Sequence, residues 1–291
     1  MNAVLQAKNL SKIYGRGESE VRALNRCDLT FEEGGFTAIV GRSGSGKTTL
    51  LHLLGGLDMP TTGTVLLEGR DIYALSDKQR TILRRRRIGF VFQFYNLVPE
   101  LTAWQNIVLP LNLDGRRPDA EYLNAVVETL GLTERLGHFA GELSGGQQQR
   151  AAIARAVIGK PSVLMCDEPT GNLDTRTTID VMRMMVRFAR RYQQTLIIVT
   201  HDPEIADYAD RVITLIDGAI TSDVTHTPIY DGTADADSLP PESVLPEEPK
   251  LPEGPIPAEE EELPLPPDDE PLILPDDGDA PCAPPPAPAA A

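Results

Sequence analysis

Alternating apolar and polar residues dominate the N-terminal part of the chain. Over residues 3–40 they follow the two-residue period of strands with one buried face, and Gly34-Gly35 supplies a turn, so antiparallel strands are expected there. The stretch Gly63–Arg70 predicts another short strand with a turn. The pattern then predicts a helix over residues 76–87 and an apolar strand over Ile88–Phe92.

The rest of the pattern alternates between helices and strands. Residues 102–142 are expected to be mostly helical, with breaks at Pro110 and Pro118. Further along, the pattern predicts a helix from residue 144 to Ile158, a strand over 162–167, a helix over 175–192, a strand over 195–200, a helix over 203–208 that Asp202 caps, and a strand over 211–216. Such alternation is typical of an α/β fold whose mainly parallel sheet is covered by helices on both faces.

One contiguous motif points to phosphate chemistry. Between the strand-like Thr37–Val40 and a helix-like stretch stands Gly41-Arg42-Ser43-Gly44-Ser45-Gly46-Lys47-Thr48-Thr49, which contains a complete G-x-x-x-x-G-K-[ST] loop. Its glycines let successive N–H groups point at phosphate oxygens. Lys47 places a positive charge on the β- and γ-phosphates, and the Thr48 hydroxyl can ligate Mg²⁺. The following helix N-terminus attracts anions as well, so we expect this stretch to bind a nucleotide.

A pair of carboxylates follows a second buried strand. Asp167 and Glu168 come directly after the apolar run Ser162–Cys166, at the end of a parallel strand where such sheets bind ligands. Asp167 suits a role in positioning Mg²⁺, and Glu168 suits polarising a water for attack on the γ-phosphate. An acidic pair is weak evidence alone, because a surface turn is its usual explanation. The phosphate loop upstream favours the functional interpretation.

A second anion cradle precedes that strand. Leu143-Ser144-Gly145-Gly146-Gln147 places a serine and two glycines at a helix N-terminus. At this point the chain resembles the ATPase subunits of ATP-binding cassette (ABC) transporters, over residues 1–224. The resemblance implies a P-loop ABC ATPase domain with an N-terminal antiparallel β part, a mainly parallel core sheet and a helical signature subdomain. It also implies ATP and Mg²⁺ as the bound groups.

The resemblance assigns further roles to matching positions. Tyr14 corresponds to the aromatic residue that stacks on adenine, although a strand-face tyrosine is the alternative. Gln93 corresponds to the glutamine that touches Mg²⁺ and relays closure to the permease. His201 corresponds to the histidine that contacts the γ-phosphate. Asp174, in Asn172-Leu173-Asp174, corresponds to the loop that crosses the dimer interface.

The same resemblance implies partners. In this family two cassettes pair head to tail, and each ATP lies between the phosphate loop of one and the signature of the other, so a homodimer bound to an integral membrane permease is expected. Five segments resemble the lipoprotein-release, macrolide-export and cell-division branch: Gly55–Asp58, Ile88–Gln93, Asn96-Leu97, Leu143–Arg150 and Asp167–Asp174. Trp104 lies in the region that faces the permease, where it either tunes partner choice or fills the core.

Charge divides the chain in two. The net charge is −16, and residues 225–291 contain 17 acidic residues with Lys250 as their one basic residue, so residues 1–224 are neutral. We therefore expect a folded domain over 1–224 and a disordered, acidic, proline-rich tail over 225–291. The tail is either a linker or a partner-binding segment that docks on the basic run Arg84–Arg87. A neutral domain gives no electrostatic case for binding nucleic acid.

Other features bear on location and function. Met1–Lys12 lacks the apolar run of a secretion signal, no apolar stretch approaches the roughly 18 residues that span a bilayer, and the three cysteines follow no metal or redox spacing. We expect a cytoplasmic protein held on the inner face of the membrane by its permease. The leading function is ATP hydrolysis that drives the permease. The alternatives are a soluble cassette ATPase without a permease and a regulatory module in which the tail is the working part.

Overall fold

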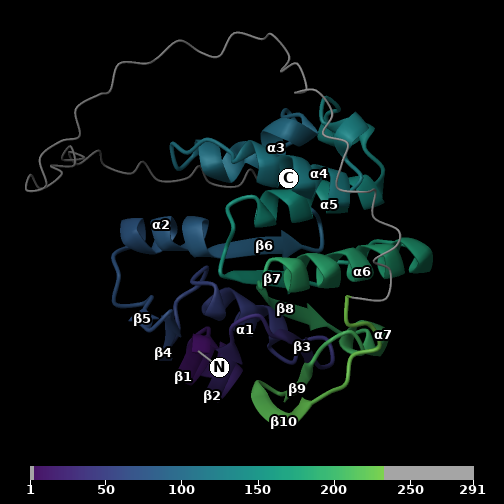
Figure 1. The fold of residues 1–291 in the computed structure, drawn as a ribbon. Helices are drawn as coiled ribbons and strands as arrows, with labels where there is room; N and C mark the ends of the chain where they lie inside the picture. The colour runs from purple at the N-terminus through teal and green to yellow at the C-terminus, as the bar shows by residue number, and fades with distance from the viewer. Residues whose placement is uncertain (1–2, 233–291) are drawn as a thin grey trace, which may run out of the picture. The chain divides into compact units, whose positions relative to one another are not determined.

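The structure, a computed structural model, describes residues 3–232 (Figure 1). The strands are β1 (Ala3–Tyr14), β2 (Val21–Glu32), β3 (Phe36–Val40), β4 (Thr62–Leu67), β5 (Arg70–Asp71), β6 (Ile88–Phe92), β7 (Val163–Asp167), β8 (Thr195–Thr200), β9 (Arg211–Ile216) and β10 (Ala219–Thr225). The helices are α1 (Lys47–Leu54), α2 (Asp77–Arg87), α3 (Ala103–Asn112), α4 (Ala120–Thr129), α5 (Gly145–Val157), α6 (Thr175–Arg191) and α7 (Pro203–Ala206). Short 3₁₀ turns occur at Gly17–Ser19, Thr133–Arg135 and Ala140–Glu142.

These strands form two sheets. The smaller is antiparallel with the order β2-β1-β4-β5, and the larger has the order β10-β9-β3-β8-β7-β6. Within the larger sheet β6, β7, β8, β3 and β9 run parallel, and β10 is antiparallel to β9. Because parallel strands end at the same edge, the segments after β3, β6, β7 and β8 all leave the sheet on one side. This confirms the expected α/β fold with an antiparallel N-terminal part.

The larger sheet is buried on both faces. Along β7, Val163 and Met165 pack with α1 and the antiparallel sheet, whereas Leu164 and Cys166 pack with α3, α4, α5 and α6. Figure 1 shows α3, α4 and α5 above the sheet, α6 beside β7, and α1 near the smaller sheet. Successive side chains of β7 point to opposite faces, and both faces are packed. The strand is therefore apolar at consecutive positions and does not alternate with polar residues.

Four details differ from the sequence-based expectations. Pro110 lies inside α3, where it lacks the N–H for one helix hydrogen bond, but the helix does not break there and continues to Asn112. Strand β10 was not expected, and α7 is shorter than the predicted helix. Packing also continues past residue 224, since Tyr230 is buried in the core that α6 lines. The remaining acidic segment lies outside the described residues, so the division into domain and tail stays a prediction.

The basic run Arg84–Arg87 is engaged with its own fold. Arg85 and Arg86 form ion pairs with Asp114, whose side chain is almost fully buried. Arg84 donates to the carbonyl oxygen of Gly56 (3.0 Å), and Arg87 lies 3.6 Å from Glu68. A docking role for this run would require these contacts to be exchanged, so the structure favours a structural role for the four arginines.

A single buried amide holds the loop between β6 and α3. Asn106 is fully buried; its side-chain oxygen accepts from the N–H of Val98 (2.8 Å), and its nitrogen lies 3.0–3.1 Å from the carbonyl oxygens of Val98, Leu101 and Thr102. Buried backbone groups that lose their partners each cost about 1–3 kcal/mol. Asn106 therefore supports the part of the loop near Val98, while Arg155 donates to the carbonyl oxygens of Tyr95 and Asn96 closer to Gln93.

Replacing Asn106 with leucine is expected to lower the free energy of unfolding by about 3 kcal/mol, because the amide of Val98 and the neighbouring carbonyl oxygens lose their partner. Chemical denaturation with a far-UV signal measures the change. Asn112→Leu is the matched control, since it makes the same replacement at an exposed position of the same helix. Equal stabilities for the two variants would contradict the assigned role.

Candidate functional site

The phosphate loop joins β3 to α1 and requires glycine at two positions. A Cβ at Gly41 would lie 2.3 Å from the carbonyl oxygen of Leu215, and one at Gly46 would lie 2.2 Å from that of Ala23. Gly46 also has φ +99°, in the region that side chains with a Cβ rarely adopt. The loop is therefore wedged against β9 and β2, which fixes its backbone before any ligand arrives.

Lys47 begins α1 with its ammonium group folded back over the loop. Its Nζ donates to the carbonyl oxygens of Gly41 (2.8 Å) and Arg42 (2.9 Å), and the residue is only 6% exposed. The Ser45 hydroxyl is also buried and has no hydrogen-bond partner within residues 3–232. The loop thus places a positive charge and a hydroxyl group without a hydrogen-bond partner in that range where phosphate oxygens are expected.

The hydroxyl of Thr48 meets the carboxylate at the end of β7. Thr48 Oγ1 lies 3.2 Å from Asp167 Oδ1, although 119 residues separate them in sequence. Burial raises the pKa of the Asp167 carboxyl, and the Thr48 hydrogen bond opposes that rise. A hydroxyl and a carboxylate beside a phosphate loop are oxygen ligands of the kind Mg²⁺ uses, together with substrate phosphates. These two residues therefore fit the expected metal site.

Glu168 and His201 face each other beside the loop. Glu168 Oε1 lies 2.8 Å from His201 Nδ1, and Glu168 has φ +46°. The positive φ turns the chain sharply after β7. A hollow of about 570 Å³ is lined by Val40, Gly41, Arg42, Ser43, Glu168, His201 and Thr214. The structure therefore brings the phosphate loop, the expected base and the expected histidine into one hollow.

Gln93 follows β6 and contacts the segment that precedes α6. The side chain of Asn172 donates to the carbonyl oxygen of Gln93 (2.8 Å), and a Cβ at Gly171 would lie 3.0 Å from Gln93 Nε2. Asp174 caps α6, with Oδ1 accepting from the N–H of Thr177 (3.0 Å). The loop at Gln93 and the expected dimer loop are thus connected by a direct hydrogen bond.

The signature segment lies apart from this hollow. Ser144 caps α5 and forms a capping box with Gln147, in which the N–H of Ser144 donates to Gln147 Oε1 (2.9 Å). Gly145 and Gly146 open the first turn, close to Tyr95 and Thr177. None of residues 144–147 lines the hollow at the phosphate loop. Within one chain the two anion cradles therefore do not share a ligand.

Tyr14 ends β1 and is 42% exposed, so its ring is available to a ligand. Its hydroxyl donates to Asp58 Oδ2 (2.7 Å). Asp58 and its neighbour Lys12 have no predicted role at the site. The available signal was the i, i+2 spacing of Lys12 and Tyr14, which places both side chains on one face of the strand.

Comparison with known proteins agrees with this geometry. The family model of the ABC transporter matches residues 24–171. The chain belongs to this family and is an ATP-hydrolysing cassette subunit.

Two curated proteins and one solved structure are similar to this chain over most of its length. The chain is 45% identical over 225 residues to the lipoprotein-releasing system ATP-binding protein LolD of Geobacter metallireducens. This alignment covers 77% of this chain and all of that protein. It is 44% identical to LolD of Shewanella frigidimarina, over 75% of this chain and 92% of that protein. The dimeric ATP-binding cassette MJ0796, solved in a post-hydrolysis state with ADP and Pi, matches with a TM-score of 0.70 at 38% identity, over 76% of this chain and 98% of that one.

Proposed function

We propose that two copies of this chain close around two Mg²⁺–ATP and drive a membrane permease of the lipoprotein-release type. The observation that carries the catalytic part is the hollow at the phosphate loop, where Glu168 and His201 pair at 2.8 Å. The similarity to LolD over nearly that protein's whole length supports the type of permease. Residues 3–232 contain no helix long and apolar enough to cross a membrane.

Residues of the phosphate loop and of the strand ends beside it have distinct tasks in this proposal. Lys47 binds the β- and γ-phosphates, while Thr48, Asp167 and Gln93 hold Mg²⁺. When bound, Mg²⁺ neutralises charge on the phosphate oxygens. Glu168 accepts a proton from the water that attacks the γ-phosphorus, as the bond to the bridging oxygen breaks.

The remaining binding residues act around these. The other residues of the loop, Gly41, Arg42, Ser43, Gly44, Ser45, Gly46 and Thr49, surround the phosphates. His201 contacts the γ-phosphate and holds Glu168 through the 2.8 Å contact. Tyr14 stacks on the adenine ring.

The dimer follows from the separation of the two cradles. Ser144, Gly145, Gly146 and Gln147 open α5 but stand outside the hollow of their own chain. Helix N-termini attract anions, so this one suits the γ-phosphate held by a second copy. Asp174 lies at the N-terminus of α6, where it reaches the same interface. The dimeric relative MJ0796 supports this arrangement.

A surface near Gln93 suits the permease. Phe94 is 74% exposed, and a groove of about 430 Å³ lies beside the segment, lined partly by Phe90, Phe92, Pro110 and Leu113. Exposed aromatic side chains next to an apolar groove are typical of protein interfaces. Binding there acts on the Gln93 loop, and the bond from Asn172 connects that loop to the dimer contact.

Phe94→Ser is expected to reduce the ATPase activity of the chain assembled with its permease by about tenfold, while the activity of the isolated chain changes less than about twofold. The comparison of both rates in detergent or nanodiscs measures this. Val224→Ser is the control, because Val224 is also exposed (51%) but lies on β10. Equal losses in the isolated and assembled chains would contradict a docking role.

The experiment that tests the function is co-purification. Tagged Glu168→Gln chain is extracted from native membranes with ATP present, and its partners are identified by mass spectrometry. A stoichiometric membrane protein supports the proposal. Recovery of soluble partners alone would favour the permease-free cassette ATPase instead.

A further inference from the structure

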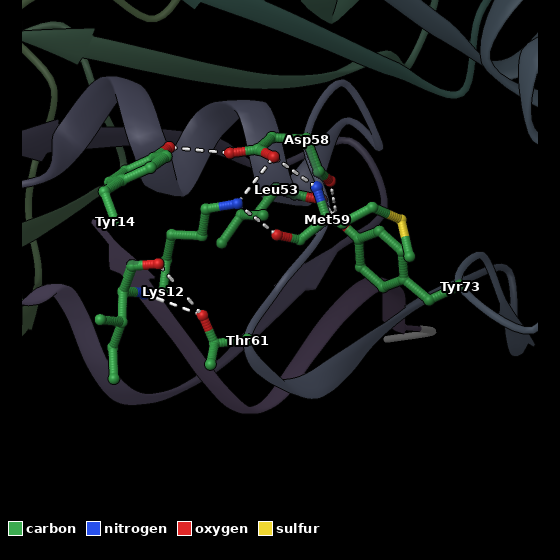
Figure 2. Close-up of polar contacts among 8 residues, drawn as sticks. Lys12, Tyr14, Leu53, Asp58, Met59, Thr61 and Tyr73 are labelled. Carbon is green, nitrogen blue, oxygen red and sulfur yellow. Dashed lines mark hydrogen bonds and ion pairs between the residues drawn. The ribbon is translucent and has the colours of Figure 1, made fainter. Parts of the chain in front are cut away.

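A compact polar cluster surrounds the tyrosine expected to bind the base (Figure 2). Asp58 accepts from the Tyr14 hydroxyl through Oδ2 (2.7 Å) and from Lys12 Nζ through Oδ1 (2.8 Å). Lys12 Nζ also donates to the carbonyl oxygen of Met59 (2.6 Å) and lies 4.7 Å from the centre of the Tyr14 ring. The carboxylate therefore holds the ring at its tip, and the ammonium group lies over the ring.

The carboxylate is itself anchored. The N–H of Met59 donates to Asp58 Oδ1 (2.7 Å), and the Tyr73 hydroxyl lies 2.9 Å from the Asp58 carbonyl oxygen and 2.5 Å from that of Leu53. The neighbouring Thr61 accepts from the N–H of Ile13 (2.9 Å). The turn at Asp58 is thus fastened to both the end of α1 and the end of β1, as Figure 2 shows.

The protonation states in the cluster make Asp58 the acceptor and Tyr14 the donor of their hydrogen bond. Partial burial opposes ionisation of Asp58, but the hydrogen bonds from Lys12 and Tyr14 prevail and lower its pKa. Partial burial and the Asp58 carboxylate raise the pKa of Tyr14. At neutral pH the tyrosine therefore keeps its proton, and its hydroxyl donates a hydrogen bond to an ionised carboxylate.

The position of Asp58 next to α1 determines what its hydrogen bond with Tyr14 does. Helix α1 runs from Lys47, in the phosphate loop, to Leu54, and Asp58 lies in the turn that follows. A bond from this turn to Tyr14 links the ring to the element that carries the phosphate-binding lysine. Lys12 lies over the ring, so an aromatic base has the opposite face for stacking.

We propose that Asp58, together with Lys12, is a positioning residue for the nucleotide base: it fixes the Tyr14 ring relative to the phosphate loop, so that stacking adds to the affinity for ATP. This rests on the proposed function, in which Tyr14 stacks on adenine. Asp58 touches neither the phosphates nor the reacting atoms, so it acts on binding through Tyr14 alone.

The test separates base binding from phosphate binding in the full chain. Asp58→Ala and Tyr14→Phe are each expected to raise the KM for ATP about fivefold with kcat within about twofold, since each removes the same charge-assisted hydrogen bond. The inhibition constant of inorganic tripolyphosphate, which has no base, is expected to stay within about twofold. Asp223→Ala is the control, because it removes a carboxylate on β10 that forms an ion pair with Arg211.

The double variant Tyr14→Phe/Asp58→Ala decides whether the residues act as a pair. Its KM is expected to equal that of either single variant, because the bond is already lost. Multiplied effects, an equal loss of tripolyphosphate affinity, or an unchanged KM in Asp58→Ala would each overturn the inference. Tyr14→Ala distinguishes a failure of this inference from a failure of the proposed function. If Tyr14→Ala leaves the KM for ATP unchanged, the stacking role of Tyr14 is wrong. If the parent chain does not hydrolyse ATP, the proposed function itself is wrong.

Discussion

Replacing Glu168 with glutamine is expected to lower ATP turnover about 1000-fold while ATP binding persists. The amide cannot accept the proton of the attacking water, and general-base removal costs about 10²–10⁴ in rate. Glutamine has nearly the same size, so it can keep the contact with His201. Without turnover the ATP-bound dimer does not reopen. Phosphate release measures the rate, and size-exclusion chromatography with and without ATP measures the trapped dimer.

Glu204→Gln is the matched control for this change. Glu204 is exposed in the first turn of α7, close in sequence to His201 but outside the hollow. Its variant is expected to hydrolyse ATP at the parent rate and to form no trapped dimer. Parent-rate hydrolysis by Glu168→Gln would instead remove Glu168 from the role of base.

Replacing Lys47 with methionine is expected to weaken ATP binding by at least about 100-fold. Methionine keeps the unbranched stem in its buried position but removes the charge that faces the phosphates. The carbonyl oxygens of Gly41 and Arg42, which the ammonium group satisfies, also lose their donor and repel phosphate oxygens. Calorimetric titration of the purified chain with Mg²⁺–ATP measures the affinity.

Lys8→Met provides the comparison, since Lys8 is an exposed lysine of β1. Its affinity for ATP is expected to match that of the parent chain. A Lys47→Met variant that bound ATP as tightly as the parent would show that the phosphates are held elsewhere.

The predictability of the fold depended on burial. Strand β8 has the predicted bounds 195–200, because all six residues are buried and four apolar residues stand between Thr195 and Thr200. Strand β10 was missed because its residues are largely exposed and it pairs with β9 alone. Tyr230 was placed in the tail because proline and acidic residues surround it in sequence, although tertiary packing buries it against α6.

The predictability of the site depended on sequence distance. The phosphate loop is contiguous, so its residues could be assigned from the motif alone. The Thr48–Asp167 contact spans 119 residues and the Glu168–His201 contact spans 33, so only the fold brings these pairs together. Asp58 belongs to the segment Gly55–Asp58, but the resemblance of that segment gave its carboxylate no role, and its contact with Tyr14 follows from the turn after α1. The catalytic and binding roles themselves stay predictions.

The separation of the signature from the phosphate loop has a consequence for inheritance. If each chain supplies half of two sites, one faulty chain damages every dimer that it enters. In a cell that makes normal and Glu168→Gln chains in equal amounts, random pairing places the faulty chain in about three dimers out of four. An allele of this kind would be genetically dominant, although a functional copy of the gene is still expressed.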